Sequence, residues 1–180
     1  GCSKGKEMEP HNFLIQQLVK MVEIIQKNNM DYAVTGGLAY SIIVEPRATT
    51  DIDIMVMLEK DLSEVFFSSI EQSFDRVIIH KNPIELRNLR IQRIFGVKNN
   101  HEIVLDFLLA ESEFHTSILN RAVEVKAFEV DIKIVSLEDL IILKKIADRK
   151  QDQLDIENIY AMYKDEIDNK YIDEWLTKLL

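Results

Sequence analysis

The stretch that decides the fold is Thr50-Asp51-Ile52-Asp53-Ile54, which begins soon after the pair Gly36-Gly37. On an extended strand, side chains two apart point to the same face with about 6.6 to 6.8 Å of rise between them, so both carboxylates can share one site. Two divalent metal ions about 3.5 to 4 Å apart favour such oxygen ligands and assist in-line displacement at phosphorus. The spacing therefore favours a metal-dependent phosphoryl-transfer site, although an acidic strand end exposed to solvent has the same pattern.

The alternation along residues 51–58 agrees with this placement. One face is an apolar stripe made of Ile52, Ile54, Val56 and Leu58. The opposite face begins with the two aspartates and continues with methionines. Because an unpaired buried charge is costly, the carboxylates must meet water, a cation or basic side chains.

The segment just upstream, residues 31–37, is a short apolar strand that runs into the two glycines and then into a helical stretch at 38–44. Glycine allows close approach of the backbone, and the free N–H groups of a helix N-terminus bind phosphate oxygens. The alternative to phosphate binding is an ordinary tight turn with no ligand. Combined with the downstream aspartates, the strand, turn and helix favour phosphate binding at Gly36 and Gly37.

Together these motifs resemble the nucleotidyltransferase superfamily with the DNA polymerase beta fold, whose pattern is Gly-Gly or Gly-Ser, a helix, and then Asp-x-Asp or Asp-x-Glu on the next strand. Within it, Gly36-Gly37-Leu38-Ala39, Arg47 and Thr49 or Thr50 look closest to abortive-infection type nucleotidyltransferase-like proteins, many of them toxins. The likeness covers roughly residues 31 to 158. It implies an α+β fold in which a mixed β-sheet is flanked by helices, with further helices at the C-terminus.

The resemblance also implies a third carboxylate, and Asp106 in the apolar strand 102–109 is the candidate. The main apolar stripe of that strand lies on the other face, so Asp106 can turn toward the aspartate pair across the sheet. There it would bind a metal together with Asp51 and Asp53 and help to deprotonate the attacking hydroxyl. The alternative is a strand aspartate paired with a nearby arginine or lysine.

A later helix has a well-marked start at Ser136, a hydroxyl cap with an acid three residues on. At about 100° per residue, Lys144 falls near the centre of the apolar arc of this helix. Its ammonium could extend past apolar neighbours to solvent. The resemblance instead implies a role for Lys144 in countering triphosphate charge.

The last motif of the family runs from this lysine to an arginine and two aspartates, which here are Arg149, Asp152 and Asp155. The implied roles are a second cation for the triphosphate and two acids that orient the cations or contact substrate. Asp152 and Asp155 could equally be a cap and a first-turn acid for a helix at 153–163.

Arg47 and the basic stretch 80–98 are further candidates for binding phosphate or the acceptor. Arg47 fits the family pattern as a phosphate contact or a partner of an active-site acid, with an ordinary surface arginine as the alternative. Residues 80–98 hold five cations against one acid, Glu85, and could grip the acceptor or the triphosphate, or form a solvated face.

Periodicity and turn residues predict the remaining elements. Helices are expected at residues 11–27, 37–44, 62–74 and 112–119, and strands at 31–35, 51–58, 76–80, 90–97 and 102–109. A hairpin at 122–127 and 130–135 should turn at Phe128-Glu129, and three helices should follow.

Composition sets limits on the class of protein. With 180 residues, 47% of them hydrophobic, the chain suits a single nucleotidyltransferase-like domain, with residues 1–9 disordered and 150–180 a helical extension. A net charge of −9 argues against wholesale coating of nucleic acid. One cysteine and no apolar run of about 20 residues favour a reducing cytoplasm and no membrane partner.

The sequence thus predicts an enzyme that uses Mg²⁺ or Mn²⁺ to transfer a nucleotide from a nucleoside triphosphate to an acceptor, which could be RNA, protein or a small molecule. The subgroup resemblance adds the toxin of a toxin–antitoxin system, with an antitoxin-like protein partner. The alternatives are a noncatalytic module of the same fold that binds nucleotides or other proteins, and a nucleotide sensor.

Overall fold

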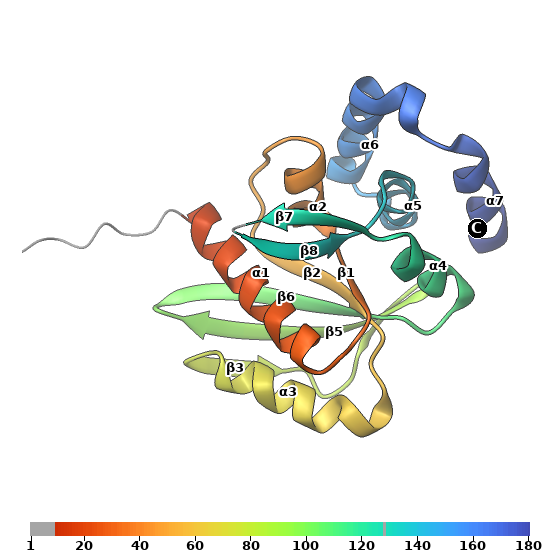
Figure 1. Ribbon diagram of the computed structural model, residues 1–180. Coiled ribbons are helices and arrows are strands. Elements are labelled where there is room, and N and C mark those ends of the chain that lie inside the picture. Colours follow the sequence, from red (N-terminus) through yellow and green to blue (C-terminus); the bar gives the residue numbers. More distant parts are fainter. Residues whose placement is uncertain (1–9, 128) are drawn as a thin grey trace, which may run out of the picture.

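The computed structural model describes residues 10–127 and 129–180. The expected disorder of residues 1–9 and the expected turn residue Phe128 therefore lie outside the described residues. Within them, a mixed sheet is flanked by helices, which confirms the predicted α+β class (Figure 1).

The sheet has eight strands in the order β3-β5-β6-β2-β1-β8-β7, with β4 paired to β5. Two pairs, β2 with β6 and β1 with β8, are parallel, and the other pairs are antiparallel. The strands are β1 Tyr32–Thr35, β2 Asp51–Val56, β3 Arg76–Ile79, β4 Ile84–Leu86, β5 Leu89–Lys98, β6 His101–Leu109, β7 Val123–Ala127 and β8 Val130–Ile134.

The helices are α1 Pro10–Lys27, α2 Gly36–Ile43, α3 Ser63–Gln72, α4 Glu113–Arg121, α5 Leu137–Ala147, α6 Lys150–Tyr163 and α7 Asn169–Leu179. Short 3₁₀ turns occupy Lys60–Leu62 and Lys164–Glu166. Figure 1 shows α1 and α3 lying along one face of the sheet, while α5, α6 and α7 gather beyond the β8 side. Helix α5 contacts α2, α6 and α7, so it joins the C-terminal helices to the rest of the fold.

The central strand β2 changes character along its length. Ile52 and Ile54 are fully buried, as the predicted apolar stripe requires. Asp51 and Asp53, which alternate with them, are partly exposed. From Met55 onward both faces are buried, because Met55 and Val56 have no exposed surface. The polar end of β2 is therefore confined to the residues around Asp51 and Asp53.

Two elements differ from the sequence-based expectation. Strand β4 was not predicted, because three residues are too few to show a period, and it turns back to β5 through Arg87, whose φ is 48°. Helix α6 begins at Lys150 rather than at 153, with Arg149 as its N-cap. Asp152 is thus inside the first turn, where its carboxylate accepts a hydrogen bond from the Arg149 backbone N–H at 3.1 Å.

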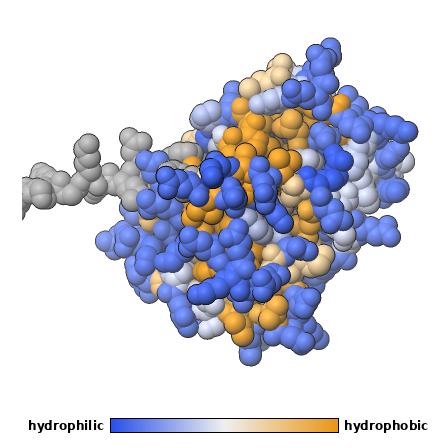
Figure 2. All heavy atoms as spheres, viewed as in Figure 1, coloured by the Kyte–Doolittle hydropathy of each residue, from blue (hydrophilic) through white to orange (hydrophobic). Residues whose placement is uncertain are grey.

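Charged and polar side chains cover most of the face shown in Figure 2, and apolar side chains reach the surface in a central band. In the described part of the chain, no helix combines the length and the apolar character that a membrane span needs.

Candidate active site

Three acids meet at the polar end of the central strands. Asp51 begins β2, and Asp53 lies directly opposite Asp106 of β6 in the parallel register. All three line a cleft of about 430 Å³. The sheet register therefore brings together the three carboxylates that the sequence nominated from two separate strands.

The first glycine of the Gly-Gly pair permits a close approach of helix α2 to these acids. Gly36 has φ +68°, and a Cβ built on it would lie 2.8 Å from the Asp53 Cγ atom. Gly37 packs in the same way against Thr49, whose Oγ1 would lie 2.6 Å from an added Cβ. Any side chain at either position would push α2 away, so the glycines place the N-terminus of α2 beside Asp53.

The N-terminus of α2 has no side-chain cap. Its N-cap residue, Thr35, is extended and its hydroxyl makes no capping hydrogen bond. Thr35 and Gly36 both line the cleft. The uncapped N-terminus of α2 thus borders the cleft at Thr35 and Gly36, and free N–H groups at a helix N-terminus can bind an anion.

Negative charge is concentrated at Asp53. Burial is the main cause that raises the pKa of its carboxyl to about 7, and the nearby charges of Asp106 and Asp51 contribute to this rise. Arg149 and Arg93 act in the opposite direction. A group in this state favours the approach of a cation, which would lower its pKa and hold it ionised.

Asp106 already has a cationic partner. Arg93 Nε donates to Asp106 Oδ1 and Arg93 Nη2 donates to Oδ2, each at 2.8 Å. The pairing that the sequence left open as an alternative for Asp106 is therefore present, and Arg93 also lines the cleft.

The donor types suit a hard divalent ion, because Mg²⁺ and Mn²⁺ bind carboxylate oxygens. Within residues 10–127 and 129–180, however, no three His, Cys, Asp or Glu side chains are placed to hold a metal ion together. Both Asp106 oxygens accept from Arg93, and Asp51 Oδ1 accepts from the Thr50 hydroxyl at 3.0 Å. The chemistry of the three acids fits the ion, and their side chains would have to reorient to bind it.

Lys144 is buried among acids instead of extending to solvent. Only 5% of the surface of Lys144 is exposed, and its Nζ donates to Asp155 Oδ2 at 2.7 Å and to Asp152 Oδ1 at 3.5 Å. Its ammonium also lies 5.6 Å from the centre of the Tyr40 ring. Lys144 lines the cleft, so its charge acts there while two aspartates fix its position.

Arg47 shares an acid with this lysine. Its Nη2 donates to Asp155 Oδ2 at 2.8 Å, and its guanidinium lies 5.0 Å from the centre of the Tyr40 ring. Asp155 is fully buried, and its other oxygen accepts from Gln151 at 2.9 Å. Arg47 was expected to contact either phosphate or an active-site acid, and the structure contains its ion pair with Asp155 of the last motif.

Arg149 and Asp152 form a second pair at the rim. Arg149 Nε donates to Asp152 Oδ2 at 2.8 Å, and the arginine side chain is 78% exposed. Burial raises the pKa of Asp152, but the hydrogen bonds from Arg149 and the charges of Arg149 and Lys144 together outweigh burial and leave this pKa below its ordinary value. Both residues line the cleft, so an exposed guanidinium is available to an anion bound there.

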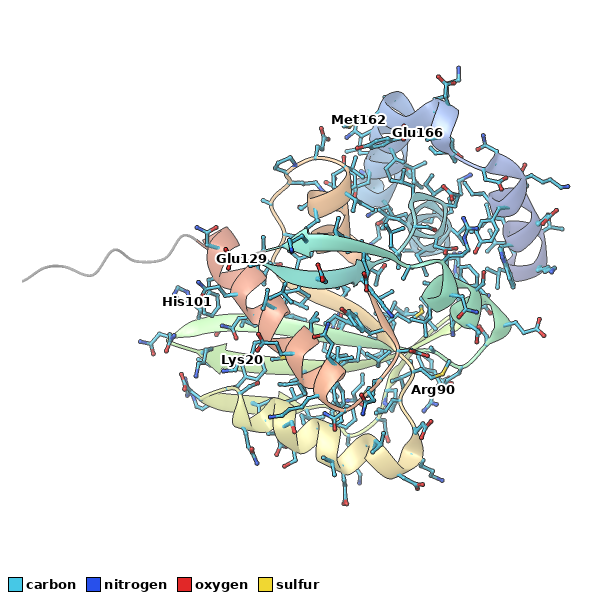
Figure 3. All side chains as sticks on the ribbon, in the orientation of Figure 1. Lys20, Arg90, His101, Glu129, Met162 and Glu166 are labelled. Carbon is cyan, nitrogen blue, oxygen red and sulfur yellow. The ribbon has the colours of Figure 1, made fainter. Side chains whose placement is uncertain are left out.

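The basic stretch 80–98 does not form one patch. Arg87 and Arg93 line the cleft, whereas Arg90 pairs with Glu111 at 2.8 Å and Lys98 lies 3.7 Å from Asp75. Lys98 lies opposite His101 in the β5–β6 hairpin. Figure 3 shows His101 and Arg90 at different ends of this hairpin, so Lys98 and Arg90 are far apart. Alternation along β5 thus sends neighbouring cations to different surroundings.

Sequence reasoning did not identify Arg93 as the partner of Asp106, although a signal was available. The dipeptide Asn99-Asn100 forms a two-residue turn in which both residues have positive φ. Asparagine pairs favour such hairpin turns, and a two-residue turn sets the register. Counting back from Lys98 opposite His101 places Arg93 opposite Asp106, as observed.

Apolar side chains also line the cleft. This apolar lining comes from β4, β5 and β6 and from α5: Leu86, Leu89, Ile91 and Leu108, and Leu140, Leu143, Ile146 and Ala147. The cleft thus combines charged and apolar lining residues, which is the usual composition of a small-molecule site.

Comparison with known proteins identifies the family. A family model described as "Nucleotidyl transferase of unknown function (DUF2204)" matches residues 14–179. The chain belongs to this family. The superfamily resemblance is confirmed, and with it the general class of transferase, whereas the closer likeness to abortive-infection type proteins stays a prediction. No curated protein sequence matches the chain.

Solved structures agree with the family at the level of the fold. ANT(2'')-Ia, an antibiotic-resistance factor, has a TM-score of 0.58 at 11% identity over 84% of each chain. The lincosamide antibiotic adenylyltransferase LnuA, solved with lincomycin bound, has a TM-score of 0.53 at 12% identity over 80% of this chain and 94% of its own. A putative nucleotidyltransferase from Thermotoga maritima has a TM-score of 0.53 at 16% identity over 96% and 98%.

Proposed function

We propose that this member of the nucleotidyl transferase family binds a divalent metal ion with a nucleoside triphosphate and transfers the nucleotide to an acceptor. The observation that carries the proposal is the register of Asp53 opposite Asp106, two residues after Asp51, with Gly36 packed against Asp53. Three acids and an uncapped helix N-terminus in one cleft suit a metal–triphosphate complex.

In this proposal Asp51, Asp53 and Asp106 hold Mg²⁺ or Mn²⁺. When bound, the ion would supply Lewis-acid stabilisation of the negative charge that develops during transfer. Asp106 also accepts the proton of the attacking hydroxyl, because it lies beside the carboxylate pair and faces the cleft.

Phosphate oxygens are bound by the first N–H groups of α2 at Gly36 and Gly37 and by the exposed guanidinium of Arg149. Lys144 contributes positive charge from a fixed, buried position. Asp152 and Asp155 act by orienting Arg149, Lys144 and Arg47. The structure thus supports different roles for the two cations of the last motif.

The apolar lining of the cleft favours a small-molecule acceptor over RNA or protein. A cleft of about 430 Å³ is within the range of small-ligand pockets, and the net charge of −9 opposes a polyanion. Among proteins of similar fold, LnuA was solved with lincomycin and ANT(2'')-Ia with adenylyl-2''-tobramycin. At 10–12% identity these structures suggest only the kind of acceptor to test.

The test is incubation of the purified protein with Mg²⁺, each labelled nucleoside triphosphate and, separately, small-molecule, RNA and protein fractions of a cell extract. Pyrophosphate release and the labelled fraction are measured. Asp53→Asn should abolish transfer and retain the circular dichroism spectrum of the folded protein. Full activity in Asp53→Asn would refute the assignment.

A noncatalytic nucleotide-binding role is a second candidate, and the bidentate pairing of Asp106 with Arg93 is the observation that favours it. Calorimetry that finds tight nucleotide binding, together with no pyrophosphate release in any fraction, would support this role over transfer.

The toxin hypothesis and a cytoplasmic site of action belong to this proposal as well. Induced expression should then arrest growth in the wild type and not in Asp53→Asn, and an antitoxin-like partner should restore growth. Equal growth of both strains would argue against a toxin.

A further inference from the structure

One guanidinium engages both oxygens of the third carboxylate in the cleft. Arg93 and Asp106 face each other across β5 and β6, and two parallel hydrogen bonds of 2.8 Å join them. This is the strong, bidentate arrangement for these two groups. The Asp106 side chain is 6% exposed and that of Arg93 is 36% exposed, so the guanidinium is the partner that faces the open cleft.

Arg93 neutralises negative charge of the acid cluster, as a bound metal ion would. Asp51, Asp53 and Asp106 crowd negative charge into one end of the cleft, and the guanidinium neutralises part of it. A divalent ion needs the same carboxylate oxygens as ligands. The ion and the guanidinium therefore compete for Asp106.

We propose that Arg93 is a positioning residue that holds Asp106 until a metal–nucleotide complex enters the cleft, and then exchanges the carboxylate for a phosphate oxygen. The inference rests on the proposed binding of a metal with a nucleoside triphosphate. A guanidinium binds phosphate as well as carboxylate in bidentate geometry, so the triphosphate offers Arg93 a new partner. A free metal ion offers none.

This exchange couples the two ligands. Free metal must displace a guanidinium that then loses its hydrogen bonds, whereas metal that arrives with nucleotide does not incur this loss. Couplings of this kind are typically about 5-fold to 150-fold in affinity. The metal-free pairing thus makes the site selective for the metal–nucleotide complex over the free ion.

The test measures Mn²⁺ binding to the intact protein by electron paramagnetic resonance of the free ion, with and without a nonhydrolysable nucleoside triphosphate analogue. Wild type, Arg93→Gln and Arg90→Gln are compared. Arg90, which is labelled in Figure 3, is the matched control. It lies on the same strand, pairs with Glu111 at 2.8 Å and is not among the residues that line the cleft.

Without nucleotide, Arg93→Gln should bind Mn²⁺ at least about 5-fold more tightly than the wild type, and the analogue should improve its affinity far less. Arg90→Gln should behave as the wild type. Unchanged or weaker Mn²⁺ binding by Arg93→Gln would overturn the inference, as would a wild type that binds no Mn²⁺ with the analogue present.

A measurement on the wild type covers the case in which Arg93→Gln does not fold. The NMR signal of the Arg93 Nε–H group should move when Mg²⁺ and the analogue are added together, and stay in place with Mg²⁺ alone. No movement with both ligands bound would overturn the exchange. Failure of the proposed function is a different result, namely intact coupling without nucleotide transfer.

Discussion

Asp155 is the buried acid on which two cations depend, and removal of its charge should destabilise the protein strongly. The carboxylate is fully buried and accepts hydrogen bonds from Lys144 at 2.7 Å, Arg47 at 2.8 Å and Gln151 at 2.9 Å. In Asp155→Asn the shape is kept, but Lys144 retains only Asp152, at 3.5 Å, as an acidic partner. Removing one member of a buried ion pair costs about 3–5 kcal/mol.

A loss of this size is a large part of the roughly 5–15 kcal/mol that stabilises a typical domain. At about 2–4 °C per kcal/mol for a chain of this length, it corresponds to a fall in Tm of roughly 6–20 °C. Urea unfolding followed by circular dichroism measures the free energy of unfolding.

The matched control is Glu174→Gln. The Glu174 carboxylate is 61% exposed and lies 4.0 Å from Lys170, so its replacement should change stability by less than about 0.5 kcal/mol. If Asp155→Asn lost no more than this control, the buried cluster would not be a source of stability and the reasoning would be refuted.

Three further predictions concern the turn, the C-terminal helix and pH. Gly36→Ala should lower the free energy of unfolding, measured by thermal melting, by more than about 2 kcal/mol, because φ is +68° and the added Cβ would lie 2.8 Å from Asp53 Cγ. A variant as stable as the wild type would contradict the close approach. Tyr171→Phe removes the hydroxyl that donates to the buried Asp139 at 2.6 Å, so unfolding should become easier by about 1.5–3 kcal/mol; an unchanged urea midpoint would count against this bond. The pKa of Asp53 is raised to about 7, so the folded protein holds a proton that the unfolded chain releases near pH 4. That stabilisation is complete below the pKa of Asp53 in the unfolded chain and is lost as pH rises through its pKa in the folded protein. Without metal, the free energy of unfolding should therefore fall between about pH 4 and pH 7. Asp53→Asn should make the free energy of unfolding depend less on pH over this range.

Much of the secondary structure could be predicted because it depends on near neighbours. The predicted strand at 102–109 is observed as His101–Leu109, and the helix expected after Ser136 begins at Leu137 with the Ser136 hydroxyl as its cap. Strand β4 escaped prediction because it is short, and the start of α6 because the cap is an arginine, which is not among the usual cap residues.

The sequence by itself determined which residues we propose to carry the chemistry: the aspartates on alternating positions of β2, Asp106, the two glycines, and the cations of the last motif. Only the tertiary structure decided their partners. Arg93 meets Asp106 through the β5–β6 register, and Arg47 reaches Asp155 from 108 residues away. The physical reason is that turn residues and periodicity act over a few positions, whereas ion pairs in a cleft depend on the order of the strands and the packing of helices against them.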